Sequence, residues 1–176
     1  MFTRNWYKAL AAEMSRVNDT FQSVTGATQT LKTDYYLYKL TSNEDGRGIP
    51  SIYKVRTTLE GNGGVIFGTG NTPPTIDDTT LSGSLVSNFS YNSSVSTARD
   101  ETGITLTALY TVTNNSADPI TICEVAIIAN LKNNDSLAMY KALLDRTVLD
   151  TPVTIPSGGI GQVEYTITFN YPTATA

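Results

Sequence analysis

The stretch GQVEYTITFNY, residues 161–171, decides the fold class of this chain. Its odd-numbered positions from 163 onward are apolar or aromatic, whereas the even-numbered positions are polar. A period of two residues is typical of a β-strand with one buried face. The preceding stretch TPVTIPSGG, residues 151–159, contains prolines and a Ser-Gly-Gly turn. We therefore expect residues 143–171 to form one long β-hairpin whose odd-numbered side chains, from Val163 to Tyr171, face a core.

Further short strands are expected before this hairpin. Apolar runs bounded by turn residues occupy residues 65–67, 83–91, 104–113, 120–130, 137–146 and 153–155. Their spacing predicts a mainly β protein, with an antiparallel β-sandwich of jelly-roll or Ig-like type over residues 61–176. Residues 121–129 are apolar at both odd and even positions, so that strand should be covered on both sides.

The N-terminal region, residues 1–60, has a different pattern. Apolar residues recur at helical spacing between residues 3 and 17, and Thr3 is placed to cap the start of an amphipathic helix. Two β-like runs, residues 31–40 and 51–59, flank a polar segment that contains Asp-Gly, which predicts a β-hairpin arm. We expect this region to make contacts between subunits.

Two interpretations of the helix remain open. It can pack on its own sheet, or it can dock onto a neighbouring subunit, because a short helix ahead of an all-β body often has no groove of its own to fill. The aromatic residues of the arm can take part in the same contact or belong to a core. The candidate interface residues are Trp6, Leu10, Met14, Tyr35, Tyr36 and Tyr38.

Composition excludes several classes of function. The chain has 176 residues and a net charge of −4, without a basic cluster, so nucleic acid is not an expected partner. It contains no histidine, the commonest general base and zinc ligand, and Cys123 has no second cysteine to pair with. The first eight residues carry charges and no continuous apolar run, so we expect neither an export signal nor a membrane span.

One carboxylate stands out. Glu124 lies within the apolar run of residues 121–129, where it must be exposed, paired with a cation or shifted in pKa. A catalytic acid and a structural ion pair both fit this position, and Arg146 and Arg99 are plausible partners. The structural pair is favoured, because no histidine or second carboxylate is close in sequence.

Other potential motifs predict no chemistry. The stretch GTGNTPP, residues 68–74, lacks the third glycine and the Lys-Ser/Thr ending of a phosphate-binding loop, so a turn and a stiff loop are expected. The acidic pairs at residues 77–78 and 100–101 lack the ligand spacing of a calcium loop. We expect no catalytic residues, no cofactor and no metal, and hence a protein that is not an enzyme.

Four stretches, taken in order, carry a resemblance. They are VIFGTGNTPPT (65–75), LYTVTNNS (109–116), ICEVAII (122–128) and LLDRTVLDTPVTIPSGG (143–159). This ordered set resembles small virion structural proteins of tailed bacteriophages, in which a Gly-Thr-Gly loop, a Thr-Asn-Asn-Ser turn, a strand with a glutamate and an Arg-to-Gly-Gly hairpin recur. The resemblance covers about residues 65–172 and brings no catalytic residues.

The resemblance implies a non-enzymatic protein of the virion, assembled in the host cytoplasm. The leading hypothesis is a capsid decoration or cement protein that forms homo-oligomers and binds other virion proteins, such as major capsid or tail proteins. A neck, tail or baseplate protein is the structural alternative. A carbohydrate- or receptor-binding module, with Tyr91 or Tyr171 stacking on sugars, is the alternative from another class.

Overall fold

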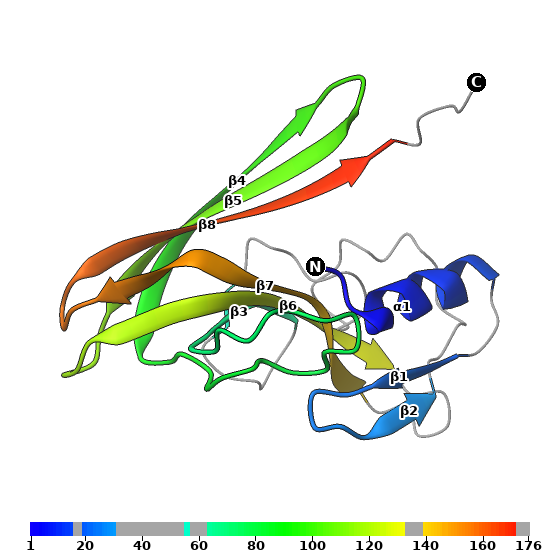
Figure 1. The fold of residues 1–176 in the computed structure, drawn as a ribbon, viewed down its shortest axis with the longest axis horizontal. Coiled ribbons are helices and arrows are strands. Elements are labelled where there is room, and N and C mark those ends of the chain that lie inside the picture. Colours follow the sequence, from blue (N-terminus) through cyan, green and yellow to red (C-terminus); the bar gives the residue numbers. More distant parts are fainter. Residues whose placement is uncertain (16–18, 31–54, 57–62, 133–138, 172–176) are drawn as a thin grey trace. The chain divides into compact units, whose positions relative to one another are not determined.

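The computed structural model describes residues 1–15, 19–30, 55–56, 63–132 and 139–171 (Figure 1). These residues form one helix and eight strands, and the strands pair antiparallel, which confirms the mainly β, antiparallel class. No helix among them is long and apolar enough to cross a membrane. The elements are α1 (Arg4–Ser15), β1 (Thr20–Gln22), β2 (Thr28–Thr30), β3 (Gly64–Gly68), β4 (Phe89–Arg99), β5 (Gly103–Asn114), β6 (Ile120–Lys132), β7 (Met139–Ile155) and β8 (Ile160–Asn170).

The chain divides into two compact units, each made of two separate segments. Unit 1 comprises Met1–Ser87 and Thr121–Pro152, and unit 2 comprises Asn88–Ile120 and Val153–Ala176. Unit 1 holds α1, the β1-β2 ribbon and the sheet β3-β6-β7, whereas unit 2 holds the sheet β4-β5-β8. The domain boundary expected at residue 60 lies outside the described residues and stays a prediction.

The centre of unit 1 is β6, which lies between β3 and β7. Every residue from 124 to 130 is buried, which confirms that this strand is covered on both sides. Its partners continue the apolar surface, since Val65 pairs with Ile127 and Phe67 with Val125. A buried cluster joins the three strands of this sheet, and three partly buried residues from the adjoining loops pack against it. The cluster consists of Ile66, Ala126, Ile128 and Leu143, with Val24, Leu81 and Leu85 packed on it.

The expected hairpin over residues 143–171 is wrong. Its two strands are present, but β7 belongs to the sheet with β3 and β6, and β8 pairs with β5. The physical reason lies in the turn at residues 156–159, whose outer backbone groups bond to another strand. The N–H of Gly158 donates to the carbonyl of Asn114, and the carbonyl of Gly159 accepts from the N–H of Asn114. The turn therefore carries the chain from one sheet to the other.

Two strand boundaries also differ from expectation. Residues 139–146 and 153–155 belong to one continuous strand, β7, which runs through Pro152, and residues 137 and 138 of the expected strand lie outside the described part of the chain. Proline is tolerated there because β7 ends the strand order of its sheet. The strand expected at residues 83–91 starts instead at Phe89 and continues to Arg99 through a run of serines, asparagine and threonine.

In unit 2 the alternation of β8 is only partly matched by burial. Val163, Tyr165 and Ile167 are buried, as expected, whereas Phe169 is 37% and Tyr171 is 45% exposed. The expectation that all five odd-numbered side chains face a core is therefore wrong for the last two.

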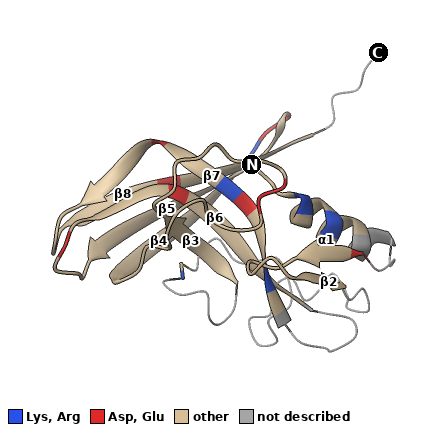
Figure 2. Ribbon diagram, turned by 60° about the horizontal axis from the view of Figure 1, so that its bottom comes forward, with Lys and Arg blue, Asp and Glu red and all other residues tan. Residues whose placement is uncertain are grey.

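The N-terminal helix is confirmed over Arg4–Ser15, and Figure 2 shows basic residues along it. Thr3 does not cap the helix with its side chain. Its Oγ1 donates to the carbonyl of Leu143 at 2.6 Å, and its N–H donates to the carbonyl of Leu144 at 2.9 Å. Phe2 forms an antiparallel bridge with Asp145, so the first residues follow the edge of β7. Thr3 is buried completely and anchors the segment there.

The region between α1 and β3 contains a hairpin that the pattern did not predict. β1 and β2 pair from Thr20 with Thr30 to Gln22 with Thr28, around a turn that contains Gly26. The expected arm falls almost wholly outside the described residues. Within it only Val55 and Arg56 are described, and Val55 forms an isolated parallel bridge with Val65.

Candidate functional site

Glu124 is the centre of the most elaborate polar arrangement among the described residues of unit 1. The side chain projects from β6 opposite Gly68 of β3 and is fully buried. A carboxylate in such a position is costly unless every oxygen is hydrogen-bonded. The surrounding loop therefore has to supply donors.

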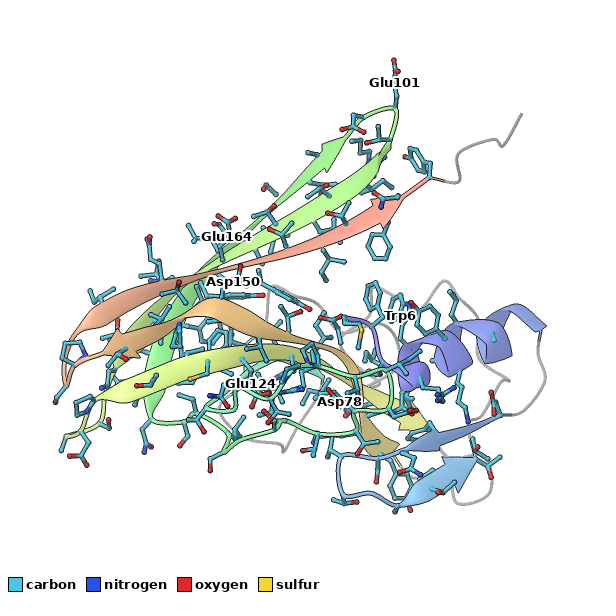
Figure 3. The ribbon with its side chains drawn as sticks, in the orientation of Figure 1. Trp6, Asp78, Glu101, Glu124, Asp150 and Glu164 are labelled. Carbon is cyan, nitrogen blue, oxygen red and sulfur yellow. The ribbon has the colours of Figure 1, made fainter. Side chains whose placement is uncertain are left out.

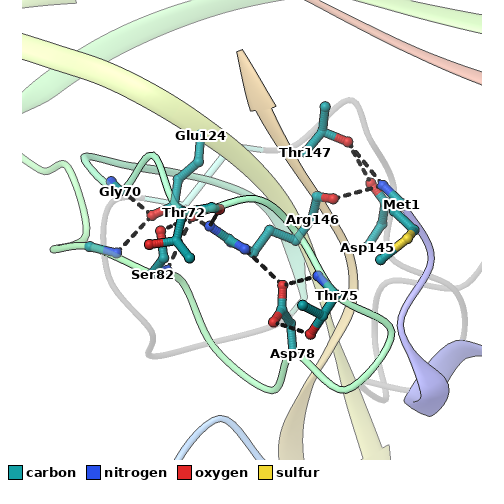
Figure 4. A network of polar contacts seen from close by, with 11 residues as sticks. Met1, Gly70, Thr72, Thr75, Asp78, Ser82, Glu124, Asp145, Arg146 and Thr147 are labelled. Carbon is teal, nitrogen blue, oxygen red and sulfur yellow. Dashed lines mark hydrogen bonds and ion pairs between the residues drawn. The ribbon is translucent and has the colours of Figure 1, made fainter. Parts of the chain in front are cut away.

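Backbone N–H groups of two loop segments surround the carboxylate (Figure 4). Oε1 accepts from the N–H of Gly70 at 3.0 Å and from that of Gly83 at 2.9 Å. Oε2 accepts from the N–H of Ser82 at 3.1 Å and from its hydroxyl at 3.3 Å. A Cβ on Gly68 or Gly70 would lie 2.5 Å from Oε1, so only glycine allows this approach. The Gly-Thr-Gly loop thus binds an internal carboxylate in place of a phosphate.

Arg146 of β7 completes the arrangement with all three guanidinium nitrogens. Nε donates to Glu124 Oε2 at 2.5 Å, Nη1 to Asp78 Oδ2 at 2.7 Å and Nη2 to the carbonyl of Thr72 at 2.7 Å. Asp78 in turn accepts from the N–H and hydroxyl of Thr75. Arg146 is only 1% exposed. We call the side chains of Glu124, Arg146 and Asp78, with the backbone groups that they bind, the charged cluster.

The charged cluster shifts the pKa of its members. Burial alone would raise the pKa of Glu124, but the Arg146 guanidinium and the N–H groups of Ser82 and Gly83 outweigh it and lower the pKa. Burial likewise opposes the charge of Asp78, whose pKa is nevertheless lowered by the bonds from Thr75 and Arg146. The pKa of Arg146 is raised by its two carboxylates despite burial. All three groups are therefore charged at neutral pH.

This geometry supports a structural role for Glu124. Both carboxylate oxygens are bound by the protein itself, and the side chain has no exposed surface for a substrate. Arg146, one of the two cations expected as partners, is the one that binds it. Within the described part of the chain, no three Asp, Glu, Cys or His residues are grouped so as to hold a metal ion.

The first residue binds next to this cluster, on the backbone of β7. The α-amino group of Met1 donates to the carbonyl of Arg146 at 2.7 Å and lies 3.0 Å from Asp145 Oδ1. The N–H of Arg146 donates back to the carbonyl of Met1 at 3.1 Å. Arg146 therefore ties the loop through its side chain and the N-terminal segment through its backbone.

Unit 2 has a polar arrangement of its own around Asn114, which is 1% exposed. Its Nδ2 donates to the carbonyls of Asp118 at 2.8 Å and Ile155 at 3.0 Å. Its Oδ1 accepts from the N–H and hydroxyl of Ser116 at 2.8 and 2.6 Å. Ser157 donates to the carbonyl of Ser116 at 2.7 Å. We call this group the amide cluster.

Of the candidate interface residues, the structure describes the side chains of Trp6 and Leu10, which are four residues apart on α1, so the expected interface stays a prediction. Trp6 is half-buried and stacks on Phe2, with ring centroids 4.8 Å apart and planes 13° apart. Leu10 is 44% exposed. The side chain of Met14 and the residues Tyr35, Tyr36 and Tyr38 lie outside the described part of the chain.

Sequence reasoning missed two exposed apolar residues of unit 1 near this helix. Tyr7 is 53% and Ile76 is 41% exposed, and the carbonyl of Ile76 accepts from the N–H of Arg4. Tyr7 and Leu10 are three residues apart on α1, which is the spacing that could have revealed their common face. Ile76 carries no such signal, because its place beside the helix depends on a long-range bond.

Comparisons of the chain with protein-family models, with curated proteins and with solved structures find no match. The function is therefore argued from the residues and their geometry.

Proposed function

We propose that this protein is a non-enzymatic virion structural protein of a tailed bacteriophage, above all a capsid decoration or cement protein that assembles as homo-oligomers. One observation carries the proposal. The four stretches that resemble phage virion proteins meet in the charged cluster and the amide cluster, where their polar residues bind one another.

The charged cluster joins three of the stretches. Gly70 and Thr72 belong to the first, Glu124 to the third and Arg146 to the fourth, and all are linked by hydrogen bonds. Their residue types follow from this packing, because a buried carboxylate needs close N–H groups and a guanidinium.

The amide cluster joins the second stretch to the end of the fourth. The N–H of Asn114 donates to the carbonyl of Gly159, and the hydroxyl of Ser157 donates to the carbonyl of Ser116. The polar residues of the four stretches therefore hold loops in place and are not free to react with a substrate. This supports a function that depends on the surface of the protein.

The proposal also includes the type of β fold. Two three-stranded antiparallel sheets, each with buried apolar residues, support an antiparallel β-sandwich of jelly-roll or Ig-like type. The N-terminal helix and arm are proposed to contact other virion proteins.

The direct test is the protein content of purified phage particles. Quantitative mass spectrometry of virions from a phage that encodes this chain is expected to find it in many copies. A copy number far below that of the major capsid protein, as a single ring would give, supports the neck, tail or baseplate alternative instead. Absence from virions, with the chain present in infected cells, would overturn the proposal.

The helix contact needs a point variant, because a truncation would also remove buried Thr3 and Asn5. Leu10→Glu places a charge on the exposed face of α1 and is expected to prevent incorporation into particles. Ile160→Glu is the matched control, since Ile160 is an equally apolar residue that is 69% exposed in unit 2. Equal incorporation of both variants would contradict a role for α1.

The carbohydrate-binding alternative rests on the exposed ring of Tyr171. A glycan array probed with the purified protein tests it, and specific glycan binding that Tyr171→Ala abolishes would favour this alternative over the assembly function.

A further inference from the structure

One face of the sheet in unit 2 is mainly apolar, because β5 and β8 carry apolar residues along it, whereas β4 contributes Ser93, Thr97 and Arg99 beside Val95. In the register of the three strands, Arg99 of β4 pairs with Ile104 of β5, which pairs with Phe169 of β8. Further along, Val95 pairs with Ala108. Paired residues of adjacent strands point to the same side of a sheet, so these side chains share one face.

Burial along this face changes from one end to the other. Ala108, Tyr110 and Val112 are fully buried. Toward the β4-β5 turn, which Glu101 marks in Figure 3, the same face becomes exposed. Val95 is 39%, Phe169 37% and Tyr171 45% exposed. We call this exposed end the distal patch, and it consists of Val95, Thr97, Arg99, Ile104, Leu106, Phe169 and Tyr171.

The opposite face of the same sheet end is polar except for Ala98, which pairs with Thr105. It carries Ser94 and Ser96 on β4, Thr105 and Thr107 on β5, and Thr166 and Thr168 on β8. If both faces of this sheet end were in contact with water, polar residues would be expected on both, and not on one face alone. The distal patch is therefore built for contact with an apolar surface.

The arrangement of the patch is complementary to itself. Arg99 lies on the β4 side of Ile104, and Phe169 lies on its β8 side. No hydrogen bond or ion pair joins the Arg99 guanidinium to another side chain in the described ranges. A two-fold axis along β5, between two facing patches, places Arg99 of each copy over Phe169 and Tyr171 of the other. Each guanidinium then meets an aromatic face, which is an attractive cation–π contact.

We propose that the distal patch is the surface through which two copies of this chain associate, with β5 on the two-fold axis and Arg99 stacked on the aromatic residues of the partner copy. The inference deepens the proposed function and rests on it for the homo-oligomer. An isologous contact of this kind uses the same residues twice.

The expected contact is small. Three strands and about five residues per strand give a face of about 14 Å by 17 Å. This is below the usual size of a specific interface, which buries about 800 Å² on each partner. We therefore expect a dissociation constant of about 10–100 μM for the dimer. On the surface of a particle, many copies are held close together, which would strengthen the association.

Sedimentation equilibrium of the 176-residue chain over about 1–300 μM tests the proposal. The native chain is expected to form a dimer. Val95→Asp places a charge in the distal patch and is expected to weaken dimerisation at least tenfold. Ser96→Asp is the matched control, because it adds the same charge one residue away on the opposite face and should change the dissociation constant less than twofold. Thermal unfolding of both variants checks that each is folded.

The role of Arg99 has a separate readout. Arg99→Lys keeps a cation and is expected to retain most of the dimerisation, whereas Arg99→Gln should weaken it several-fold. A native chain that is monomeric throughout, or a dimer that Val95→Asp and Ser96→Asp weaken equally, would overturn the inference. Presence of the chain in virions in either case would leave the proposed virion role standing, without the dimer contact through the distal patch.

Discussion

The charged cluster of unit 1 and the amide cluster of unit 2 perform the same task with different chemistry. Each ties loops to strands through a side chain that is almost fully buried, Arg146 in one and Asn114 in the other. In unit 1 the bonds join a guanidinium to two carboxylates. In unit 2 they join a neutral amide to carbonyl and hydroxyl groups.

The difference concerns what happens when one partner is lost. When a neutral amide is removed, its former partners stay buried without a hydrogen bond, and the protein loses stability by the free energy needed to desolvate them. A guanidinium that disappears leaves a buried carboxylate without its counter-charge, which costs considerably more. The two clusters therefore predict different sensitivity to mutation and to pH.

The largest loss of stability is expected for Arg146→Met, which leaves the carboxylate of Glu124 buried without a counter-charge. We expect the free energy of unfolding to fall by about 3–5 kcal/mol. The double variant Glu124→Gln/Arg146→Met should lose less than the sum of the two single variants, because the unpaired charge is gone. Urea titrations of the native chain, the two single variants and the double variant measure the free energies of unfolding. Additive losses would show that the two side chains do not act as a pair.

A smaller loss is expected for Asn114→Ala in the amide cluster. Removal of the side chain leaves the carbonyls of Asp118 and Ile155 without its N–H groups, and we expect a loss of about 2 kcal/mol. The same urea titration measures it. A loss as large as that of Arg146→Met would remove the distinction between charged and neutral clusters.

The pH dependence of stability separates the clusters further. In the folded protein the pKa values of Glu124 and Asp78 lie below 4.5 and 3.8, the ordinary values that the unfolded chain takes. As pH falls through those ordinary values, the unfolded chain binds protons that the folded chain does not. The stability from both groups is therefore complete above about pH 5 and is lost progressively toward lower pH.

Neutral substitutions in the charged cluster should weaken this dependence. The variant Glu124→Gln/Arg146→Gln is expected to lose stability less steeply between about pH 5 and 3 than the native chain. Asn114→Ala should keep the native slope, because the amide does not titrate. Unfolding midpoints measured by circular dichroism at each pH test both expectations. Equal slopes for all three proteins would assign the acid sensitivity to other carboxylates.

The smallest effect is expected at the rim of the amide cluster. Ser116→Ala removes the hydroxyl that bonds to Asn114 Oδ1 but leaves the backbone N–H in place. We expect a loss of about 0.5–1 kcal/mol. Unfolding by urea measures it, and a loss above that of Asn114→Ala would show that the hydroxyl, and not the amide, holds the turn.

Much of the secondary structure could be predicted because it depends on local pattern. The strands β3, β5, β6 and β8 and the helix follow from the periodicity of their own residues. The pairing of Glu124 with one of two arginines could also be foreseen, because a carboxylate in a doubly covered strand requires a cation.

What failed depends on contacts between distant segments. The turn at residues 156–159 has the composition of a hairpin turn, yet its bonds to Asn114 send β7 and β8 to different sheets. Thr3 has the composition of a helix cap, yet its hydroxyl bonds to Leu143. In both cases the local pattern is compatible with two partners, and the choice is made by residues far away in the sequence.

The attachment of the first residues to β7 has a consequence for synthesis of the chain. The bond between Thr3 and Leu143 spans 140 positions, and unit 1 is interrupted by a segment of unit 2. At about 5–20 residues per second, the ribosome needs roughly 7–28 s to reach Leu143 of β7 after it has made Thr3. During that interval the apolar residues of the helix and β3 have no β6 or β7 to pack against. A chaperone would therefore find the most exposed apolar surface while only the N-terminal half of the chain has been made.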